Sequence, residues 1–140
     1  MQIREFEWPD DFDVVTDLWL ASGLHNPSID GIDNLRDVSQ RNPGLFLLAI
    51  DNEQVVGSVI GTFDGRRGYI YHVAVHPNSR RKSYATALLR EVENRLWAMG
   101  VQKVRFMVSK SNHQAIAFYR TLGFGVDEHS YSMSKTRPAE

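Results

Sequence analysis

A strand-to-helix junction in the middle of the chain constrains the fold more than any other feature of the sequence. The β-branched run Val73–Val75 ends at Pro77, three consecutive cations follow, and an amphipathic helix begins a few residues later. This order predicts a helix N-terminus just beyond a strand end, where the first N–H groups have no intrahelical partner. Such a terminus attracts anions, and Arg80, Arg81 and Lys82 add side-chain charge. The junction therefore indicates a phosphate or pyrophosphate site, although a solvated cationic turn fits the same residues.

Segments with strand and helix patterns alternate along the rest of the chain. Strands are expected over Gln2–Glu7, Leu45–Ile50, Gln54–Phe63, Tyr69–Val75, Lys103–Val108 and, as one or two strands, Phe124–Lys135. Helices are expected over Phe12–Trp19 with Asp10 or Asp11 as the cap, Ser28–Arg41, Arg81–Met99 and His113–Leu122. The second to fourth strands form an antiparallel meander, whereas the fifth follows a helix and is expected to lie parallel to the fourth. The pattern predicts an α/β (α+β) fold in a single domain, residues 1–140, with a mixed, mostly antiparallel sheet of about six to seven strands and about four flanking helices.

The composition excludes several classes of function. The chain has no cysteine, which excludes disulfides, thiolate metal sites and a cysteinyl acyl-enzyme. Its five histidines are scattered without ligand spacing, so no metal is expected. A net charge of −1 does not suit a general polyanion binder, and no nucleic-acid partner is expected. With no run long enough to span a bilayer and no cationic-then-apolar leader, we expect a cytoplasmic protein without a membrane partner, and a homodimer is left open.

The junction resembles motif A of the GNAT superfamily of N-acetyltransferases, V-x-P-x-x-(Q/R)-(R/G)-x-G-x-(G/A) followed by a helix. The matching residues are Val75, Pro77, Arg80, Arg81 and Ala85. One position departs, because Ser83 stands where the family usually has glycine. Serine is small and a helix-start φ is expected to be negative, so this departure is predicted to be tolerated. In that family the loop wraps the pyrophosphate of acetyl-CoA, so the resemblance implies acetyl-CoA as the co-substrate.

A second segment follows at the distance that the family has between its motifs. It is similar to the motif B signature N-x-x-A-x-x-x-Y-x-x-x-G-F, and the matching residues are Asn112, Ala115, Tyr119, Gly123 and Phe124. Taken alone, Asn112 fits a helix cap and Tyr119 fits a core aromatic residue. Two motifs in order are a strong signal, and the chain is identified as a member of the GNAT superfamily.

The resemblance implies roles for individual residues. The cofactor-binding residues that it implies are Val73, Ala74, Val75, Arg80, Arg81, Lys82, Ser83, Tyr84, Ala85, Thr86 and Asn112. Val73 and Val75 would pair with the pantetheine arm through backbone groups. Tyr119 would be the general acid for the departing thiolate, because a phenol stays protonated at neutral pH.

The general base is left open by the sequence. Some members that acetylate protein N-termini place a glutamate at the position of Met107, which cannot take a proton. His72 is the titratable candidate on the fourth strand, and Tyr71 is placed to hold a relay water. An inert strand histidine, with water as the proton acceptor, fits equally.

These expectations define a function and its rivals. The chain is expected to be an acetyl-CoA-dependent N-acetyltransferase that transfers acetyl directly to a primary amine of a small molecule or peptide. Alternatives are transfer of a longer acyl group and a non-catalytic acyl-CoA-binding or regulatory module with the same fold. A phosphate-loop nucleotide binder is disfavoured, since neither G-x-x-x-x-G-K-[ST] nor G-x-G-x-x-G occurs. The acceptor pocket is expected from Ser22–Asp30, Asp64–Gly68 and the last strands.

Overall fold

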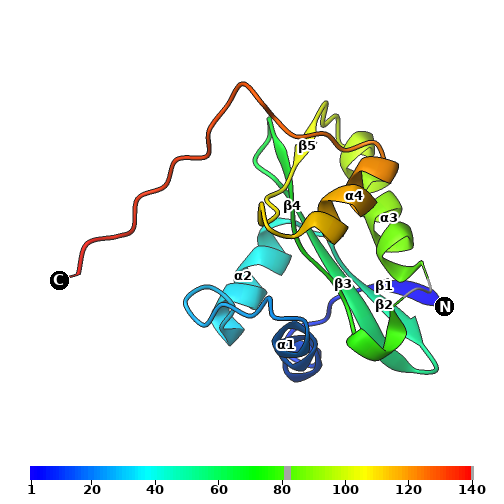
Figure 1. The fold of residues 1–140 in the computed structure, drawn as a ribbon. Coiled ribbons are helices and arrows are strands. Elements are labelled where there is room, and N and C mark those ends of the chain that lie inside the picture. The colour runs from blue at the N-terminus through cyan, green and yellow to red at the C-terminus, as the bar shows by residue number, and fades with distance from the viewer. Residues whose placement is uncertain (81–82, 140) are drawn as a thin grey trace. The chain divides into compact units, whose positions relative to one another are not determined.

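The computed structural model describes residues 1–80 and 83–139, which form two compact units, Met1–Met107 and Val108–Glu140. The first unit holds a five-stranded sheet, shown in Figure 1. Its strands are β1 (Gln2–Glu5), β2 (Phe46–Asp51), β3 (Gln54–Phe63), β4 (Gly68–Val75) and β5 (Val104–Arg105). They lie side by side in chain order; β1 to β4 pair antiparallel, and β5 pairs parallel with β4. The α/β class, the meander and the parallel fifth strand are confirmed.

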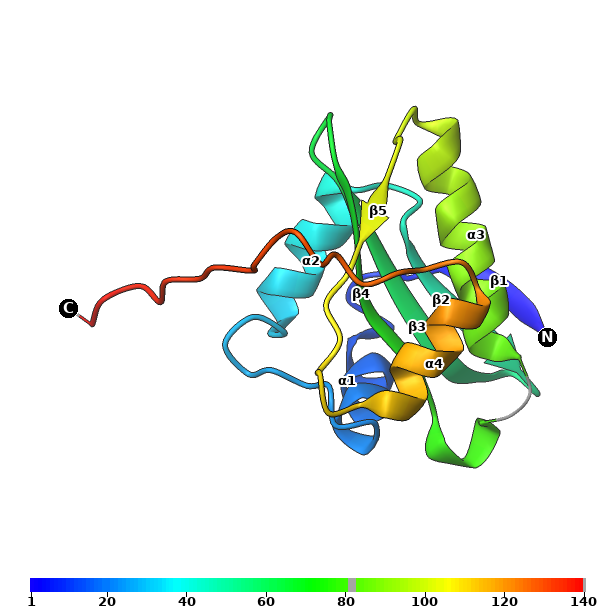
Figure 2. The same cartoon turned by 45° about the horizontal axis from the view of Figure 1, so that its top comes forward.

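Helices of the first unit cover both faces of this sheet. α1 (Phe12–Ala21) and α2 (Ile32–Arg41) lie on one face, and α3 (Tyr84–Ala98) lies on the other (Figures 1 and 2). A short 3-10 helix, Pro77–Ser79, links β4 to α3. In the part of the chain that the structure describes, no helix is long and apolar enough to cross a membrane.

The α3 face is apolar and tightly packed. A Cβ atom on Gly61 of β3 would lie 2.6 Å from Cγ2 of Val92, and one on Gly57 would lie 3.0 Å from Cδ1 of Leu88. Glycine at both positions therefore lets the helix rest directly on the strand backbone. Leu88 and Val92 are fully buried there.

The opposite face is built around aromatic rings. Phe6 stacks on Phe46 with ring centroids 4.2 Å apart, and Trp19 of α1 stacks on Phe46 at 6.0 Å. The buried residues of this cluster are Phe6, Val15, Leu18, Trp19, Leu35, Phe46, Leu48, Ile60 and Ala74. The two faces thus share a sheet but differ in the kind of side chain that fills them.

Three expected elements differ from the structure. The second helix begins at Ile32 rather than Ser28, because the side chains of Asn26 and Asp30 bond backbone N–H groups in this stretch and hold it as a turn. β5 has two residues instead of the six of Lys103–Val108, since its pairing with β4 ends early. The expected final strands over Phe124–Lys135 are wrong, because the described residues of that segment pair with no strand, and the sheet has five strands rather than six or seven.

The second unit contains α4 (His113–Thr121). Asn112 caps it, with its Oδ1 accepting from the N–H of Ala115 at 3.1 Å. Gly123 follows with φ of 95°, and the N–H of Phe124 donates to the carbonyl of Tyr119. The chain therefore folds back at the end of this helix as the sequence predicts.

Candidate functional site

A β-bulge interrupts β4 in the middle of the strand. Ser58 pairs with Ala74 and Ile60 pairs with Tyr71, so β4 holds one extra residue between these pairs. His72 lies at the bulge with φ of 47°, in the left-handed region that few residues other than glycine adopt. The bulge turns the side chain of His72 toward α1, where its ring meets Trp19 at a centroid distance of 4.4 Å.

Beyond the bulge, β4 has an open edge in the first unit. Among the described residues, β5 pairs with β4 at Gly68 and Tyr69 alone. The N–H of His76 donates to the carbonyl of Val56 on β3 at 2.8 Å, and backbone groups of alternate residues face opposite edges. Val73 and Val75 therefore direct their backbone groups away from β3. These groups face the edge of β4 that lies beyond its short pairing with β5.

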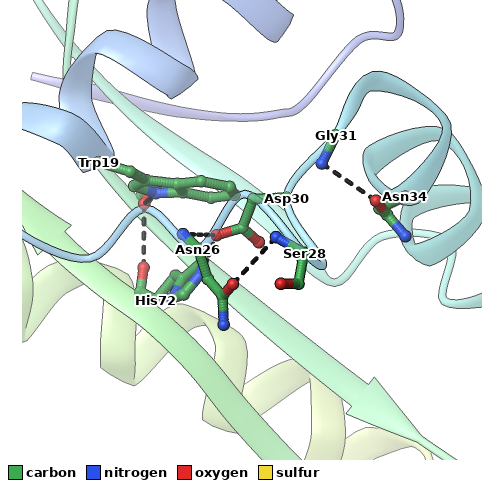
Figure 3. Close-up of polar contacts among 8 residues, drawn as sticks. Trp19, Asn26, Ser28, Asp30, Gly31, Asn34 and His72 are labelled. Carbon is green, nitrogen blue, oxygen red and sulfur yellow. Dashed lines mark hydrogen bonds and ion pairs between the residues drawn. The ribbon is translucent and has the colours of Figure 1, made fainter. Parts of the chain in front are cut away.

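His72 is paired with a buried carboxylate. Its Nε2 lies 2.9 Å from Oδ2 of Asp30, and Asp30 is 5% exposed (Figure 3). The same oxygen accepts from the N–H of Asn26 at 2.8 Å. Asp30 belongs to the segment between α1 and α2, so this pair ties that segment to the bulge of β4.

A buried serine connects the bulge to α1. Ser58 of β3 is fully buried, accepts from Nε1 of Trp19 at 2.8 Å and donates to the carbonyl oxygen of His72 at 3.0 Å. Each of these buried polar groups has a partner, which removes most of the cost of burying it. Trp19 of α1, Ser58 of β3, His72 of β4 and Asp30 of the α1–α2 segment therefore form one connected polar network.

Two tyrosines of β4 extend this face. Ile70 pairs with Gly61 and so faces α3, whereas Tyr69 and Tyr71 face the side of α1 and α2. Their rings stack at 6.3 Å, and Tyr71 is 45% exposed. The two tyrosines and His72 thus share a face on which part of the surface is open.

The turn before β4 has a local structural explanation. Oδ1 of Asp64 accepts from the N–H groups of Arg66 and Arg67, each at 2.7 Å. These two bonds hold the pKa of the Asp64 carboxyl below its ordinary value. Asp64–Gly68 is therefore a hairpin turn of the ordinary kind.

The junction after β4 differs from its expectation at one residue. Arg81 and Lys82 lie outside the described residues, and Arg80 is exposed. Ser83 precedes α3 with φ of 62°, so the expected negative φ is wrong. The left-handed conformation explains why glycine suits this position, and Ser83 occupies it at a cost in strain.

In the first turn of α3, the side chain of Tyr84 and the backbone N–H groups have different roles. Tyr84 is buried, and its hydroxyl donates to Oδ2 of Asp51 at the end of β2. This bond raises the pKa of the Tyr84 hydroxyl above its ordinary value. Tyr84, Ala85 and Thr86 supply the N–H groups of the helix start, which have no intrahelical partner by geometry. The side chain of Tyr84 therefore attaches the start of α3 to the end of β2.

The second unit holds the remaining candidates. Tyr119 of α4 is half-buried, and its ring meets those of Phe118 at 5.4 Å and Phe124 at 6.1 Å. Burial raises the pKa of the Tyr119 hydroxyl above its ordinary value, which keeps it protonated over a wider pH range. The side chain of Asn112 has the capping role already described. Both alternatives that the sequence left for these residues, a cap and an aromatic contact, are thus present.

Two features of the site lay outside the sequence argument. Asp30 stands 42 residues before His72, and Ser58 stands among apolar residues of a strand, so no local pattern joins either of them to the histidine. Among the described residues, no three His, Cys, Asp or Glu side chains gather as a metal ion would require.

Comparison with known proteins gives consistent matches. The sequence pattern of the Acetyltransferase (GNAT) family matches residues 2–124. An acetyltransferase of Pectobacterium atrosepticum and one of Yersinia pseudotuberculosis are each 38% identical over 124 residues, covering 89% of this chain and 87% of the relative.

Solved structures share the fold. Ard1 from Thermoplasma volcanium has a TM-score of 0.80 at 25% identity, covering 89% of this chain and 82% of that one. The PaiA N-acetyltransferase from Thermoplasma acidophilum, solved in complex with coenzyme A, has a TM-score of 0.82 at 18% identity and 92% coverage of both chains.

Proposed function

Because the chain belongs to the acetyltransferase (GNAT) family, we propose that it transfers the acetyl group of acetyl-CoA directly to a primary amine of a small molecule or peptide. The observation that carries this proposal is the open edge of β4 beyond its bulge, which is followed along the chain by the 3-10 helix Pro77–Ser79 and then by the N-terminus of α3. An extended amide-bearing arm fits such an edge, and its phosphates fit the helix start that follows.

The acetyl donor is bound by backbone and cations in this proposal. Val73 and Val75 pair with the pantetheine arm, since their backbone groups face the open edge. Arg80, Arg81 and Lys82 neutralise the pyrophosphate together with the first N–H groups of α3. Asn112 contributes from the start of α4.

The reaction proceeds by direct attack in this proposal. The amine nitrogen attacks the thioester carbonyl, the C–N bond forms, and the C–S bond breaks as the thiolate leaves. Tyr119 donates its proton to the thiolate, and His72 takes the proton that the amine must lose. With no cysteine in the chain, an acyl-cysteine intermediate is excluded.

Binding of the donor is tested by calorimetry with coenzyme A. Arg81→Ala is expected to lose about 1.5–3 kcal/mol of binding free energy, as for a hydrogen bond to a charged group. Arg41→Ala, an exposed cation at the end of α2, is the matched control and is expected to bind as the wild type does. Absence of coenzyme A binding, or equal binding by both variants, would contradict the proposal.

Chemistry is tested by thiol release from acetyl-CoA across a panel of amines. Tyr119→Phe is expected to lower kcat by about 10²- to 10⁴-fold, and less with an activated thioester whose leaving group needs no proton. Tyr131→Phe, at a 95% exposed residue, is the control and is expected to keep full activity. A fully active Tyr119→Phe protein would contradict the general-acid role of Tyr119 and would leave only its packing contacts.

A second candidate function is a non-catalytic acyl-CoA-binding module. The strained Ser83 at the helix start and the absence of a carboxylate at Met107 favour it. This candidate predicts coenzyme A binding without thiol release by any amine in the panel, so the same two experiments separate it from the enzyme.

A further inference from the structure

We propose that Asp30 is a positioning residue for His72: it receives the Nε2–H, leaves Nδ1 as the proton acceptor, and offsets the charge that His72 gains from the amine. The inference deepens the proposed function and rests on it for its kinetic consequence. The hydrogen-bond assignment itself depends only on the geometry of the pair.

The direction of the bond between His72 and Asp30 follows from the chemistry of the carboxylate. Oδ2 of Asp30 accepts from the backbone N–H of Asn26, which can only donate. A carboxylate oxygen has no hydrogen to donate and has lone pairs for two donors, so the Nε2 atom 2.9 Å away is the donor. A neutral imidazole has one ring hydrogen, so with Nε2 protonated the lone pair is on Nδ1.

Both sides of the pair are held in place. Asp30 is fixed within its own turn, where its N–H donates to the carbonyl of Asn26 at 2.9 Å and the Asn26 side chain accepts from Ser28. His72 is fixed by the ring of Trp19 and by the bond from Ser58 to its carbonyl. Figure 3 shows the two groups meeting between the α1–α2 segment and β4. Such a preorganised pair needs little rearrangement when a proton arrives.

In the proposed function, the free nitrogen of His72 is the proton acceptor. The side chain of His72 is 19% exposed, and no described residue bonds its Nδ1. His72 also precedes Val73 directly, so its backbone stands at the start of the open edge of β4. A purely structural role for Asp30, tying a loop to a strand, predicts none of the catalytic effects below.

The first experiment reads the tautomer of His72 without any substrate. Long-range ¹⁵N–¹H spectra of ¹⁵N-histidine-labelled protein are recorded above neutral pH, and the His72 signals are assigned by their loss in His72→Gln. We expect an unprotonated Nδ1 and a slowly exchanging Nε2–H, with the slow exchange lost in Asp30→Ala. A hydrogen on Nδ1 in the wild type would overturn the proposal.

The second experiment measures kcat with amine and KM for acetyl-CoA in variants of Asp30. Asp30→Asn keeps an oxygen for both donors and removes the charge, so kcat with amine is expected to fall on the order of 10-fold while KM for acetyl-CoA stays unchanged. Asp33→Asn is the matched control, because that carboxylate is on α2 and its side chain is 76% exposed. Urea unfolding of each variant separates a catalytic loss from a loss of folded protein.

A double-variant cycle decides whether Asp30 acts through His72. In the His72→Gln background, Asp30→Asn is expected to cause no further loss of kcat. Losses that multiply, a fully active His72→Gln protein, or an equal rise in KM for acetyl-CoA would each overturn the proposal. If no amine releases thiol even from the wild type, the proposed function fails, and the spectra still decide which nitrogen of His72 has the hydrogen.

Discussion

The two faces of the sheet are formed by the same strands but differ in the side chains that fill them: the α3 face is apolar, and the α1/α2 face includes a polar network. On the α3 face, glycines of β3 bring apolar side chains of the helix onto the strand backbone, and these side chains are fully buried. On the α1/α2 face, three polar side chains, Asp30, Ser58 and His72, are built into an aromatic core. Packing alone requires no such polar groups, because replacing buried charged groups by well-packed apolar residues of similar volume is often neutral or stabilising.

This difference suggests a division of labour between the faces. Changes on the α3 face are expected to alter the free energy of unfolding and to leave the activity of the folded molecules unchanged. Changes on the α1/α2 face are expected to alter both, because the same side chains that pack there also hold His72. The predictions below test this division, beginning with the largest effect.

Leu88→Ala is expected to cause the largest loss of stability. Leu88 is fully buried on the α3 face, and its truncation should lower the free energy of unfolding by about 2–5 kcal/mol. Urea unfolding measures the loss, and kcat per folded molecule is expected to match the wild type. Leu20→Ala, at a 60% exposed residue of α1, is the control. A large change in kcat with Leu88→Ala would break the comparison between the faces.

Gly61→Ala tests the closeness of the same contact from the strand side. The new methyl group would lie 2.6 Å from Cγ2 of Val92, so helix or strand must shift at a cost of about 1–3 kcal/mol. Gly125→Ala is the control, since a Cβ there meets no atom within 4 Å. Equal thermal stability of the two variants would show that α3 can shift away from β3 at little cost in free energy.

Ser58→Ala tests the polar face. The substitution leaves the N–H of Trp19 and the carbonyl of His72 without their partner, which should cost about 1–3 kcal/mol. We also expect a lower kcat, because the bulge that orients His72 loses a support. Ser22→Ala is the control, since the buried Oγ of Ser22 has no partner among the described residues. A stability loss with unchanged kcat would limit Ser58 to packing.

Ser83→Gly is expected to have the smallest effect, and a favourable one. Glycine relieves the left-handed strain at φ of 62°, and the gain should be about 0.5–1 kcal/mol after the extra entropy of the unfolded chain is subtracted. Ser79→Gly, at a residue without positive φ, is the control and should be destabilised slightly. A loss of stability in Ser83→Gly would contradict the assignment of strain to this residue.

The parts of the fold that local patterns encode were predictable from the sequence. The three meander strands, the helix after Ser83 and the turn after Tyr119 follow from alternation, helical spacing and glycine placement. The short β5 and the missing strands over Phe124–Lys135 were not predictable, since a strand exists only where a neighbour pairs with it.

The candidate site divides in the same way. His72 stood out as a titratable residue on a strand, and the junction stood out by its cations. The partner of His72 did not, because Asp30 meets it through tertiary structure across 42 residues of sequence. The strain at Ser83 was also missed, since a backbone angle before a helix depends on how the preceding loop enters it.

The ring contact between Trp19 and His72 has an optical consequence. Trp19 is fully buried, whereas Trp8 and Trp97 are 38% and 43% exposed, so its emission should lie to the blue of theirs. With 4.4 Å between the ring centroids of Trp19 and His72, the emission of Trp19 is expected to change in His72→Gln, so the protein reports the state of this contact without any added dye.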